Sequence, residues 1–230
     1  MGRPAVTTGN TVAIVPAFNE SATVGKVVSA LVPHIPVIVI DDGSQDDTGA
    51  QASQAGAIVI RSSTNSGYDG ALSQGFKEAD RRGFQQVVTL DADGEHDPTL
   101  ISNFLDALQD VPLVLGRRPH TQRFTEKLFG LIVLRRWGVH DILCGMKGYH
   151  LTLYKQNGGW SHAQSVGTEL ALFGLRHGVP FREIAVRGRP RKGRPRFGSM
   201  ISGNFRILIG LVGALSRPLP PLLERPWVKS

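Results

Sequence analysis

The chain has 230 residues, of which 41% are hydrophobic, and this is enough to build one large α/β domain or two small ones. Cys144 is the only cysteine, which excludes an intramolecular disulfide. Residues 1–10 lack the long apolar stretch of a signal peptide. From these two observations we expect a cytoplasmic location. The formal net charge is +7 and is concentrated in two segments, Arg117–Lys127 and Arg182–Arg206, which favours polyanionic partners such as nucleic acid, an anionic membrane surface or phosphorylated substrates.

The first half of the chain alternates apolar runs with helical patterns. The apolar runs predict strands at residues 12–15, 37–40, 57–60, 87–90 and 111–115. The helical patterns cover residues 24–31, a short stretch capped by Thr48, residues 71–82, and a stretch opened by Asp97 as N-cap with Pro98 at the first position. Pro16 is expected to end the first strand. This alternation predicts an α/β fold with a mostly parallel sheet and right-handed crossovers.

The pattern changes after Gly116. A loop over Arg117–Arg123, a helix over Phe124–Trp137, a strand over Cys144–His150, a helix over Val166–Arg176 and a loop over Arg187–Gly198 are expected. The apolar segment Phe205–Leu215 is shorter than the roughly 20 residues that span a bilayer. This segment can therefore lie on a membrane surface or pack on the domain.

Polar motifs follow three of the predicted strands, after Val15, Ile40 and Leu90. Ligands of parallel α/β sheets bind at the carboxyl ends of the strands, which meet at one edge of the sheet. The sequence therefore predicts a ligand site at this edge.

Asp91 and Asp93 follow the fourth predicted strand, and Glu95 comes two residues later. Carboxylates at this spacing can converge on one hard cation, and Mg²⁺ and Mn²⁺ prefer oxygen ligands that they often share with substrate phosphates. A polar turn that caps the next helix is the alternative, but Asp97 already serves as that cap. The motif favours a metal site.

Three other motifs carry little information when each is taken alone. Asp41-Asp42-Gly43-Ser44 can bind a base or ribose, or form an ordinary Asp-Gly turn. Pro16-Ala17-Phe18-Asn19-Glu20 can bind a ligand, or supply a helix cap at Asn19 or at the following Ser21. The segment Asn65–Ala71 contains Gly67 and can bring backbone N–H groups near a phosphate.

Taken in this order, the four motifs resemble those of the family 2 glycosyltransferases of the GT-A fold, and within them the dolichol-phosphate mannose synthase and polyprenyl-phosphate glycosyltransferase group. The resemblance covers Val12 to about Gly116 and continues more loosely to about Phe197. It implies a Rossmann-like, mostly parallel central sheet flanked by helices. We accordingly expect a single domain with a nucleotide-sugar-binding half at 11–116, an acceptor-binding half at 117–204, and a C-terminal apolar helix and tail at 205–230.

The resemblance also implies roles for individual residues. Those expected to hold the nucleotide-sugar are Pro16, Phe18, Glu20, Asp42, Gly67 and Asp91. Those expected to hold Mg²⁺ or Mn²⁺ are Asp91, Asp93 and Glu95. The segment Arg191–Phe197 looks like the family's Arg-x-Gly-x-Ser-Lys-Tyr/Phe loop, with Pro195 in place of Ser and Arg196 in place of Lys. Arg191 and Arg196 are thus expected to neutralise the departing diphosphate, together with the metal.

The acceptor determines whether the reaction needs a base. The resemblance implies inversion at the anomeric carbon, and a hydroxyl acceptor would require a general base. Asp141 lies in a segment similar to the family's Asp-x-x-Ser-Gly-Phe and is the candidate, although a salt bridge with a nearby arginine explains it equally well. Glu169 is given a supporting role, or a salt bridge on a helix face. A lipid phosphate is already an anion and needs only positioning cations, for which Arg117, Arg118 and Arg123 are available.

Three functions are therefore carried forward. The first is sugar transfer from a GDP- or UDP-sugar to a polyprenyl phosphate, with peripheral contact to the cytoplasmic face of the membrane. The second keeps the fold but uses a soluble or glycan hydroxyl acceptor. The third is a non-catalytic basic module that binds membrane or nucleic acid. Nucleic acid is not expected as a partner, because no aromatic residues alternate with the basic ones to stack on bases.

Overall fold

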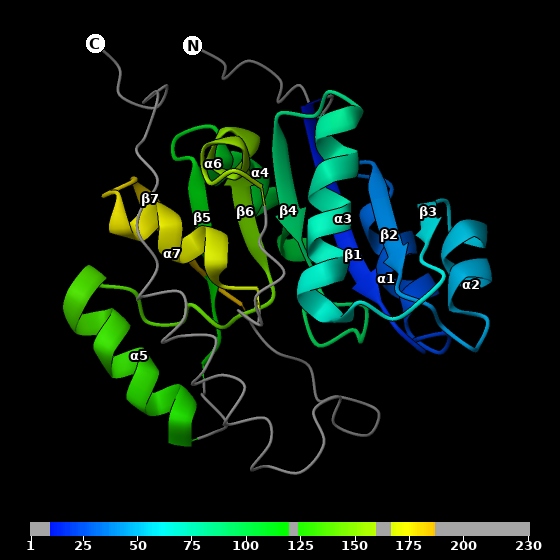
Figure 1. Ribbon diagram of the computed structural model, residues 1–230, viewed down its shortest axis with the longest axis horizontal. Helices are drawn as coiled ribbons and strands as arrows, with labels where there is room; N and C mark the ends of the chain where they lie inside the picture. The colour runs from blue at the N-terminus through cyan, green and yellow to red at the C-terminus, as the bar shows by residue number, and fades with distance from the viewer. Residues whose placement is uncertain (1–9, 120–123, 160–166, 187–230) are drawn as a thin grey trace.

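The computed structural model describes residues 10–119, 124–159 and 167–186, and its centre is one seven-stranded sheet in the order β3-β2-β1-β4-β6-β5-β7 (Figure 1). The strands are β1 (Thr11–Ala17), β2 (Val37–Asp41), β3 (Ile58–Arg61), β4 (Gln86–Thr89), β5 (Leu113–Arg117), β6 (Lys147–His150) and β7 (Phe181–Ala185). β6 runs antiparallel to both of its neighbours, and the other pairs are parallel. The prediction of a mostly parallel α/β sheet is confirmed.

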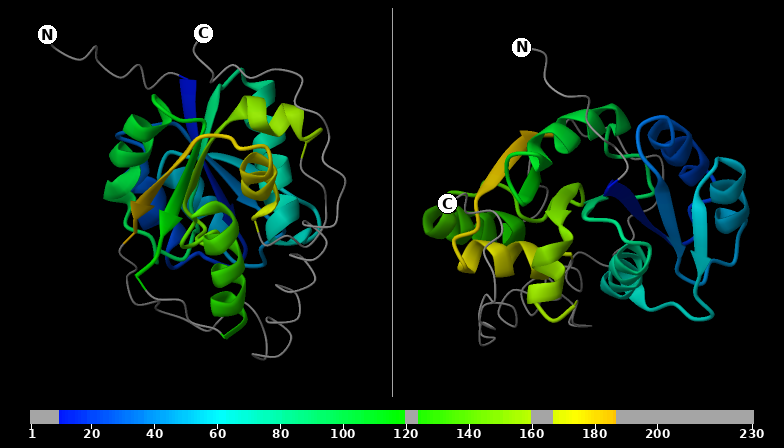
Figure 2. Two further views of the ribbon diagram at one scale, coloured as in Figure 1. Left: turned by 90° about the vertical axis from the view of Figure 1, so that its left-hand side faces the viewer. Right: turned by 90° about the horizontal axis from the view of Figure 1, so that it is seen from above.

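Helices cover both faces of this sheet (Figure 2). They are α1 (Val24–Leu31), α2 (Thr48–Gln54), α3 (Gly67–Arg81), the short 3-10 helix η2 (Pro98–Leu100), α4 (Ile101–Leu108), α5 (Phe124–Trp137), α6 (Leu151–Gln156) and α7 (Glu169–Arg176). α3, α6 and α7 supply one hydrophobic core, whereas α1, α2 and α4 supply the core on the opposite face. The fold is thus a three-layer arrangement of helices, sheet and helices.

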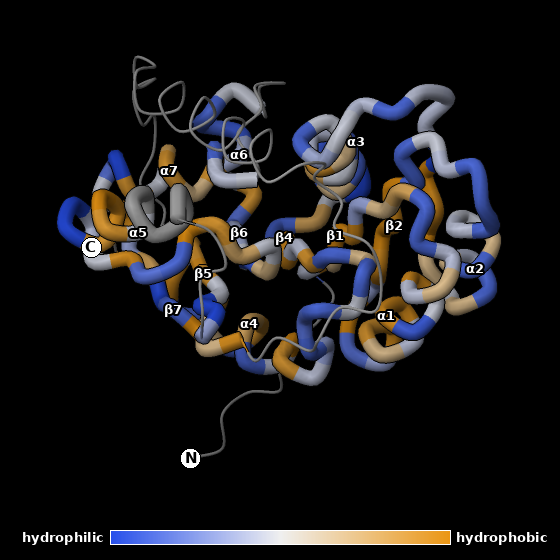
Figure 3. Tube along the Cα trace, turned by 90° about the horizontal axis from the view of Figure 1, so that it is seen from below, coloured by the Kyte–Doolittle hydropathy of each residue, from blue (hydrophilic) through white to orange (hydrophobic). Residues whose placement is uncertain are grey.

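The strands join the two cores because their side chains alternate between the faces. In β1, Val12 and Ile14 enter one core, whereas Ala13 and Val15 enter the other. Figure 3 shows the hydrophobic residues concentrated along strands such as β2 and β5 and along α1. Gly75 lets α3 approach the sheet closely, since a Cβ atom there would lie 2.4 Å from Cγ2 of Ile14.

β1 corrects one prediction, because it continues through Pro16 to Ala17 instead of ending at Pro16. The backbone of Ile14 faces β4, since its carbonyl oxygen accepts from the Leu90 N–H at 3.1 Å, and Pro16 faces the same side two residues later. The pairing of β1 with β4 has ended by then, at Ile14 and Thr89. Proline therefore removes no ladder hydrogen bond at this position.

The starts of the helices test the capping residues and first residues that the sequence predicted. Asp97 caps η2 as predicted, because its side chain accepts from the Thr99 N–H. The prediction of Thr48 as a cap was wrong: Thr48 is the first residue of α2, and its hydroxyl group accepts from the Glu20 N–H at 2.7 Å. α3 begins four residues before the predicted Ala71, at Gly67.

The second half was predicted less completely. α5 has the predicted bounds, β6 is confined to the last part of the predicted strand, and α7 begins at Glu169. α6 and β7 were not predicted. The segments Arg187–Gly198 and Phe205–Leu215 lie outside the described residues. Within the described part of the chain, no helix is long and apolar enough to cross a membrane.

Candidate active site

The strand order reverses between β1 and β4, because the chain places β2 and β3 on one side of β1 and then returns to add β4 on the other side. In open α/β sheets, ligands bind at such a reversal, beyond the carboxyl ends of the strands. The motifs after β1, β2 and β4 lie at this edge. The structure therefore brings these three motifs together where the fold favours a ligand, and the fourth, Asn65–Ala71, joins them through contacts with Asp42 and Asp91.

The loops that follow β1 and β2 are tied together. The Asn19 N–H donates to the Ser44 hydroxyl group at 3.0 Å, and the Asn19 side-chain oxygen accepts from the Gln45 N–H at 2.9 Å. Asn19 has a φ of 54°, a left-handed conformation that asparagine tolerates better than most residues. Phe18 is 41% exposed beside these contacts, so its ring is available at the surface of this edge.

Asp42 is buried and anchors the start of α3. Its carboxylate accepts from the Ser66 N–H and hydroxyl group at 2.9 and 2.7 Å, and from the Gly67 N–H at 2.8 Å. Gly67 has a φ of 78°, which favours glycine at this turn. The Gly67 N–H is thus engaged with Asp42 and is not directed to a separate phosphate. Asp42 joins the second motif to the third, and its predicted contact with a nucleoside stays a prediction.

Asp91 follows β4 and is held from two sides. The Tyr68 hydroxyl group donates to Asp91 Oδ1 at 3.0 Å. On the other side the carboxylate lies against Gly145, where an added Cβ atom would be 2.2 Å from Oδ2. Gly145 is itself fixed, because its carbonyl oxygen accepts from the Thr89 hydroxyl group at 2.8 Å. Tyr68 and Gly145 were not among the predicted site residues, although both lie within segments that carried the resemblance.

Asp93 and Glu95 lie in the turn that follows. Asp93 Oδ1 accepts from the Glu95 N–H at 3.0 Å, so this carboxylate also shapes the turn. Within the described ranges, no three or more His, Cys, Asp or Glu side chains form a group that could hold a metal ion. The predicted set of Asp91, Asp93 and Glu95 is therefore not assembled as three convergent ligands.

His96 is a buried neighbour of this turn that was not among the predicted site residues. Its Nδ1 lies 3.7 Å from Asp91 Oδ2, and its Nε2 lies 3.7 Å from the Cys144 sulfur. Burial alone would lower the pKa of His96, but the Cys144 sulfur and the carboxylates of Asp91 and Asp93 raise that pKa to about 9. The ring thus adds positive charge behind Asp91.

Asp141 is engaged with an arginine. Its carboxylate accepts from the Arg118 Nε at 2.7 Å, from an Arg118 terminal nitrogen at 3.0 Å and from the Arg118 backbone N–H at 3.1 Å. The Leu143 N–H also donates to it, at 3.1 Å. Asp141 is buried, and Arg118 is 25% exposed. This geometry matches the salt bridge that the sequence left open as the alternative to a general base.

The remaining predicted cations are distributed differently. Arg117 ends β5 and is exposed. Arg123, Arg191 and Arg196 lie outside the described residues. Glu169 begins α7, and its carboxylate accepts from the Asn157 side chain at 3.1 Å, which is a link between α7 and the end of α6. Of the predicted cations within the described residues, Arg118 is therefore the one that pairs with a carboxylate.

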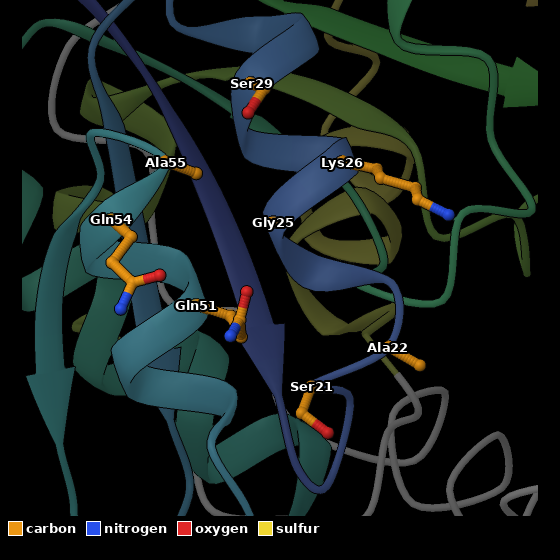
Figure 4. Close-up of a pocket in the computed structure, with 8 residues that line it drawn as sticks. All are labelled: Ser21, Ala22, Gly25, Lys26, Ser29, Gln51, Gln54 and Ala55. Atoms are coloured by element: carbon orange, nitrogen blue, oxygen red, sulfur yellow. The ribbon is translucent and has the colours of Figure 1, made fainter.

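A groove of about 300 Å³ lies elsewhere, between α1 and α2 (Figure 4). It is lined by Ser21, Ala22, Gly25, Lys26, Ser29, Gln51, Gln54 and Ala55. None of the predicted site residues lines it. The groove is thus distinct from the motifs at the edge of the sheet, although Ser21 directly follows Glu20.

The fold defines a class: an α/β protein of the GT-A type. Residues 12–156 match the family model described as Glycosyl transferase family 2. The chain belongs to this family, and the predicted resemblance and enzyme class are confirmed.

Similar proteins extend the comparison. The polyprenol monophosphomannose synthase of Mycolicibacterium smegmatis is 31% identical over an alignment of 173 residues, and the match covers 62% of each protein. The undecaprenyl-phosphate mannosyltransferase of Micrococcus luteus is 36% identical over an alignment of 114 residues, and the match covers 46% of each. The chain thus spans under two thirds of these two relatives.

Among solved structures, the glucosyl-3-phosphoglycerate synthase of Mycobacterium tuberculosis, in complex with Mn²⁺, UDP and glucosyl-3-phosphoglycerate, superimposes with a TM-score of 0.73. The sequence identity is 19%, and the match covers 95% of this chain and 87% of that one. At this identity the similarity supports the fold.

Proposed function

We propose that this chain transfers a sugar, with inversion, from a nucleoside diphosphate sugar to a polyprenyl phosphate. The observation that carries the proposal is the placement of Asp91, fixed by Tyr68 and Gly145 at the strand reversal, with the Arg118–Asp141 pair beyond the end of β5. Residues 11–116 would bind the donor and residues 117–204 the acceptor. The two relatives above are named for polyprenol and undecaprenyl-phosphate mannosyl transfer, which supports this acceptor.

The donor side has the chemistry that a divalent cation requires. Mg²⁺ and Mn²⁺ are commonly bound by one or two carboxylates, with water and substrate phosphates as the other ligands. Asp91 and Asp93 provide two such carboxylates, so they fit this mode without Glu95 as a third ligand. When bound, the ion supplies positive charge to the departing diphosphate. Tyr68 and Gly145 orient Asp91 for that task, because they restrict its carboxylate on both sides.

The acceptor side favours a phosphate over a hydroxyl group. A general base needs a free carboxylate oxygen near the acceptor, and both oxygens of Asp141 accept hydrogen bonds from Arg118 or Leu143. We infer that Asp141 orients the Arg118 guanidinium, which binds an acceptor that is already an anion. A bidentate pair restricts the arginine more than a single contact would.

α5 supports peripheral contact with a membrane. Leu131, Ile132 and Leu134 are 46%, 49% and 38% exposed, and Arg135 and Arg136 follow in the last turn. A group of exposed apolar side chains next to basic ones can contact an anionic lipid surface. We infer that α5 brings the acceptor side of the enzyme to its lipid substrate.

The donor half of this proposal can be tested by binding. UDP- and GDP-sugars with Mn²⁺ are expected to raise the melting temperature of the parent chain, and the shift should vanish with excess EDTA or with Asp93→Ala. Loss of the metal should reduce affinity at least about tenfold, because the diphosphate charge is then opposed only by side chains. An unchanged shift in EDTA would contradict the metal-dependent part of the proposal.

A further inference from the structure

Lys147 is a buried cation without a role in the reaction as described so far. It lies in β6, opposite Thr89 of β4 and Leu115 of β5, and is 2% exposed. Removing an ammonium group from water is costly, and burial lowers the pKa of Lys147. A methionine of similar length would fill the space without that cost. A charge kept at such a position points to a function.

The ammonium group of Lys147 holds one backbone position. Its Nζ donates to the carbonyl oxygen of Gly167 at 3.1 Å, and the Gly167 N–H donates to Asp69 Oδ1 at 2.8 Å. Gly167 has a φ of 70°, and an added Cβ atom would lie 2.8 Å from Cε1 of Tyr68. A cation, an anion and an aromatic ring therefore confine this residue together.

Tyr68 connects this position to the donor motif. Its ring lies against Gly167, and its hydroxyl group donates to Asp91 Oδ1 at 3.0 Å. Gly167 directly precedes Thr168 and Glu169, where α7 begins in the acceptor half. One side chain thus contacts both the carboxylate that faces the donor and the backbone on the acceptor side.

We propose that Lys147 is a positioning residue for sugar transfer, which fixes Gly167 against Tyr68 and thereby holds Asp91 and the start of α7 in one arrangement. This inference rests on the glycosyl transfer proposed above. Lys147 contributes to the rate by restricting geometry, since small displacements of a catalytic carboxylate are costly. Its role is therefore read from the rate, because removing it also deprives the Gly167 carbonyl oxygen of a buried hydrogen bond and lowers stability as well.

The test compares Lys147→Met, Tyr68→Phe and the double variant with the parent chain, and uses Lys77→Met on the exposed side of α3 as the matched control. Lys147→Met and Tyr68→Phe should each lower kcat at least about tenfold and leave KM for the donor within about twofold. The kcat of the double variant should be little lower than that of the more impaired single variant, because both substitutions act on one contact. Lys147→Met should remain folded at the assay temperature, and Lys77→Met should match the parent in every respect.

Hydrogen exchange gives a second readout that does not depend on an acceptor. The Gly167 amide should exchange at least about fivefold faster in Lys147→Met than in the parent, because its carbonyl anchor is lost. A parent chain without transfer activity would count against the proposed function, while this exchange rate would still test the contact. Parent-like kcat in either variant, unchanged exchange at Gly167, or failure of Lys147→Met to fold would each overturn the proposal.

Discussion

Asp91 illustrates how a carboxylate can be held without a salt bridge to an arginine or lysine of the described residues. A tyrosine hydroxyl group fixes one oxygen, and the missing side chain of Gly145 leaves room for the other. His96 lies behind Oδ2 at 3.7 Å and adds positive charge. At the scale of single residues, the space at Gly145 is therefore as important as the hydrogen bond from Tyr68.

Gly145→Ala tests this arrangement. The new methyl group would overlap Asp91 Oδ2, so the carboxylate must move. This displacement of the Asp91 carboxylate is expected to reduce kcat about a hundredfold. Gly130→Ala in α5 is the control, because an added Cβ atom there meets only the His140 carbonyl oxygen at 3.8 Å. Equal rates of labelled sugar transfer in the two variants would refute the importance of this space.

Asp141→Asn distinguishes an anchor from a base. If Asp141 orients Arg118, the substitution should weaken acceptor binding by about 2 kcal/mol, which is roughly thirtyfold in KM for the lipid phosphate. The pH profile of kcat should keep its shape. A base would instead be revealed by a loss of about a hundredfold or more in kcat and by the disappearance of the acidic limb. Asp110→Asn is the control, since Asp110 pairs with Arg182 at 3.1 Å on the surface.

At the scale of elements, the turn after β4 contains acidic residues with two different proposed tasks, metal binding and helix capping. Asp91 precedes the turn, Asp93 lies within it, and Asp97 at its end caps η2, which leads into α4. Asp97→Ala is therefore expected to cost about 1 kcal/mol of unfolding free energy and to lower the melting temperature by about 2–4 °C. Donor affinity measured by calorimetry should stay unchanged. A large loss of donor affinity at parent-like stability would instead indicate that Asp97 takes part in donor binding.

Elements with a regular pattern of hydrophobic residues were predictable from the sequence. The continuous apolar runs of β1 and β2 and the buried stripe of α1 follow from burial alone, so their bounds fall within about two residues of the prediction. β7 was missed because it lies at the edge of the sheet, where Ile184 is its only buried residue and no apolar run forms. Pro16 misled the prediction of the end of β1, since a rule for central strands does not apply where a neighbouring strand has ended.

The positions of the motif residues were predictable, but their contacts were not. Asp42, Asp91 and Asp93 follow buried strands as expected, because acidic residues after apolar runs are visible in the sequence. The partners of Asp42 and Asp141 depend on which loops the sheet brings together, as with Arg118, which is 23 residues away from Asp141. Long-range pairs of this kind leave no local pattern. Lys147 was missed for the same reason.

At the scale of the whole molecule, one continuous sheet joins the two expected halves. The donor motifs follow β1, β2 and β4, whereas Arg118 follows β5, and β6 connects them through antiparallel pairing with both β4 and β5. α5 carries exposed apolar and basic residues beyond β5. The proposed donor site, acceptor site and membrane contact therefore follow one another along the molecule.

The most direct test of this account is the transfer of a radiolabelled sugar from UDP- or GDP-sugars with Mn²⁺ to a polyprenyl phosphate in vesicles. The predicted result is label in the organic extract as an acid-labile lipid, reduced at least about a hundredfold by Asp93→Ala, because the metal-binding charge is lost. Vesicles without the lipid phosphate should yield no labelled lipid. Label that enters only water-soluble acceptors, or transfer that survives Asp93→Ala, would contradict the central claim.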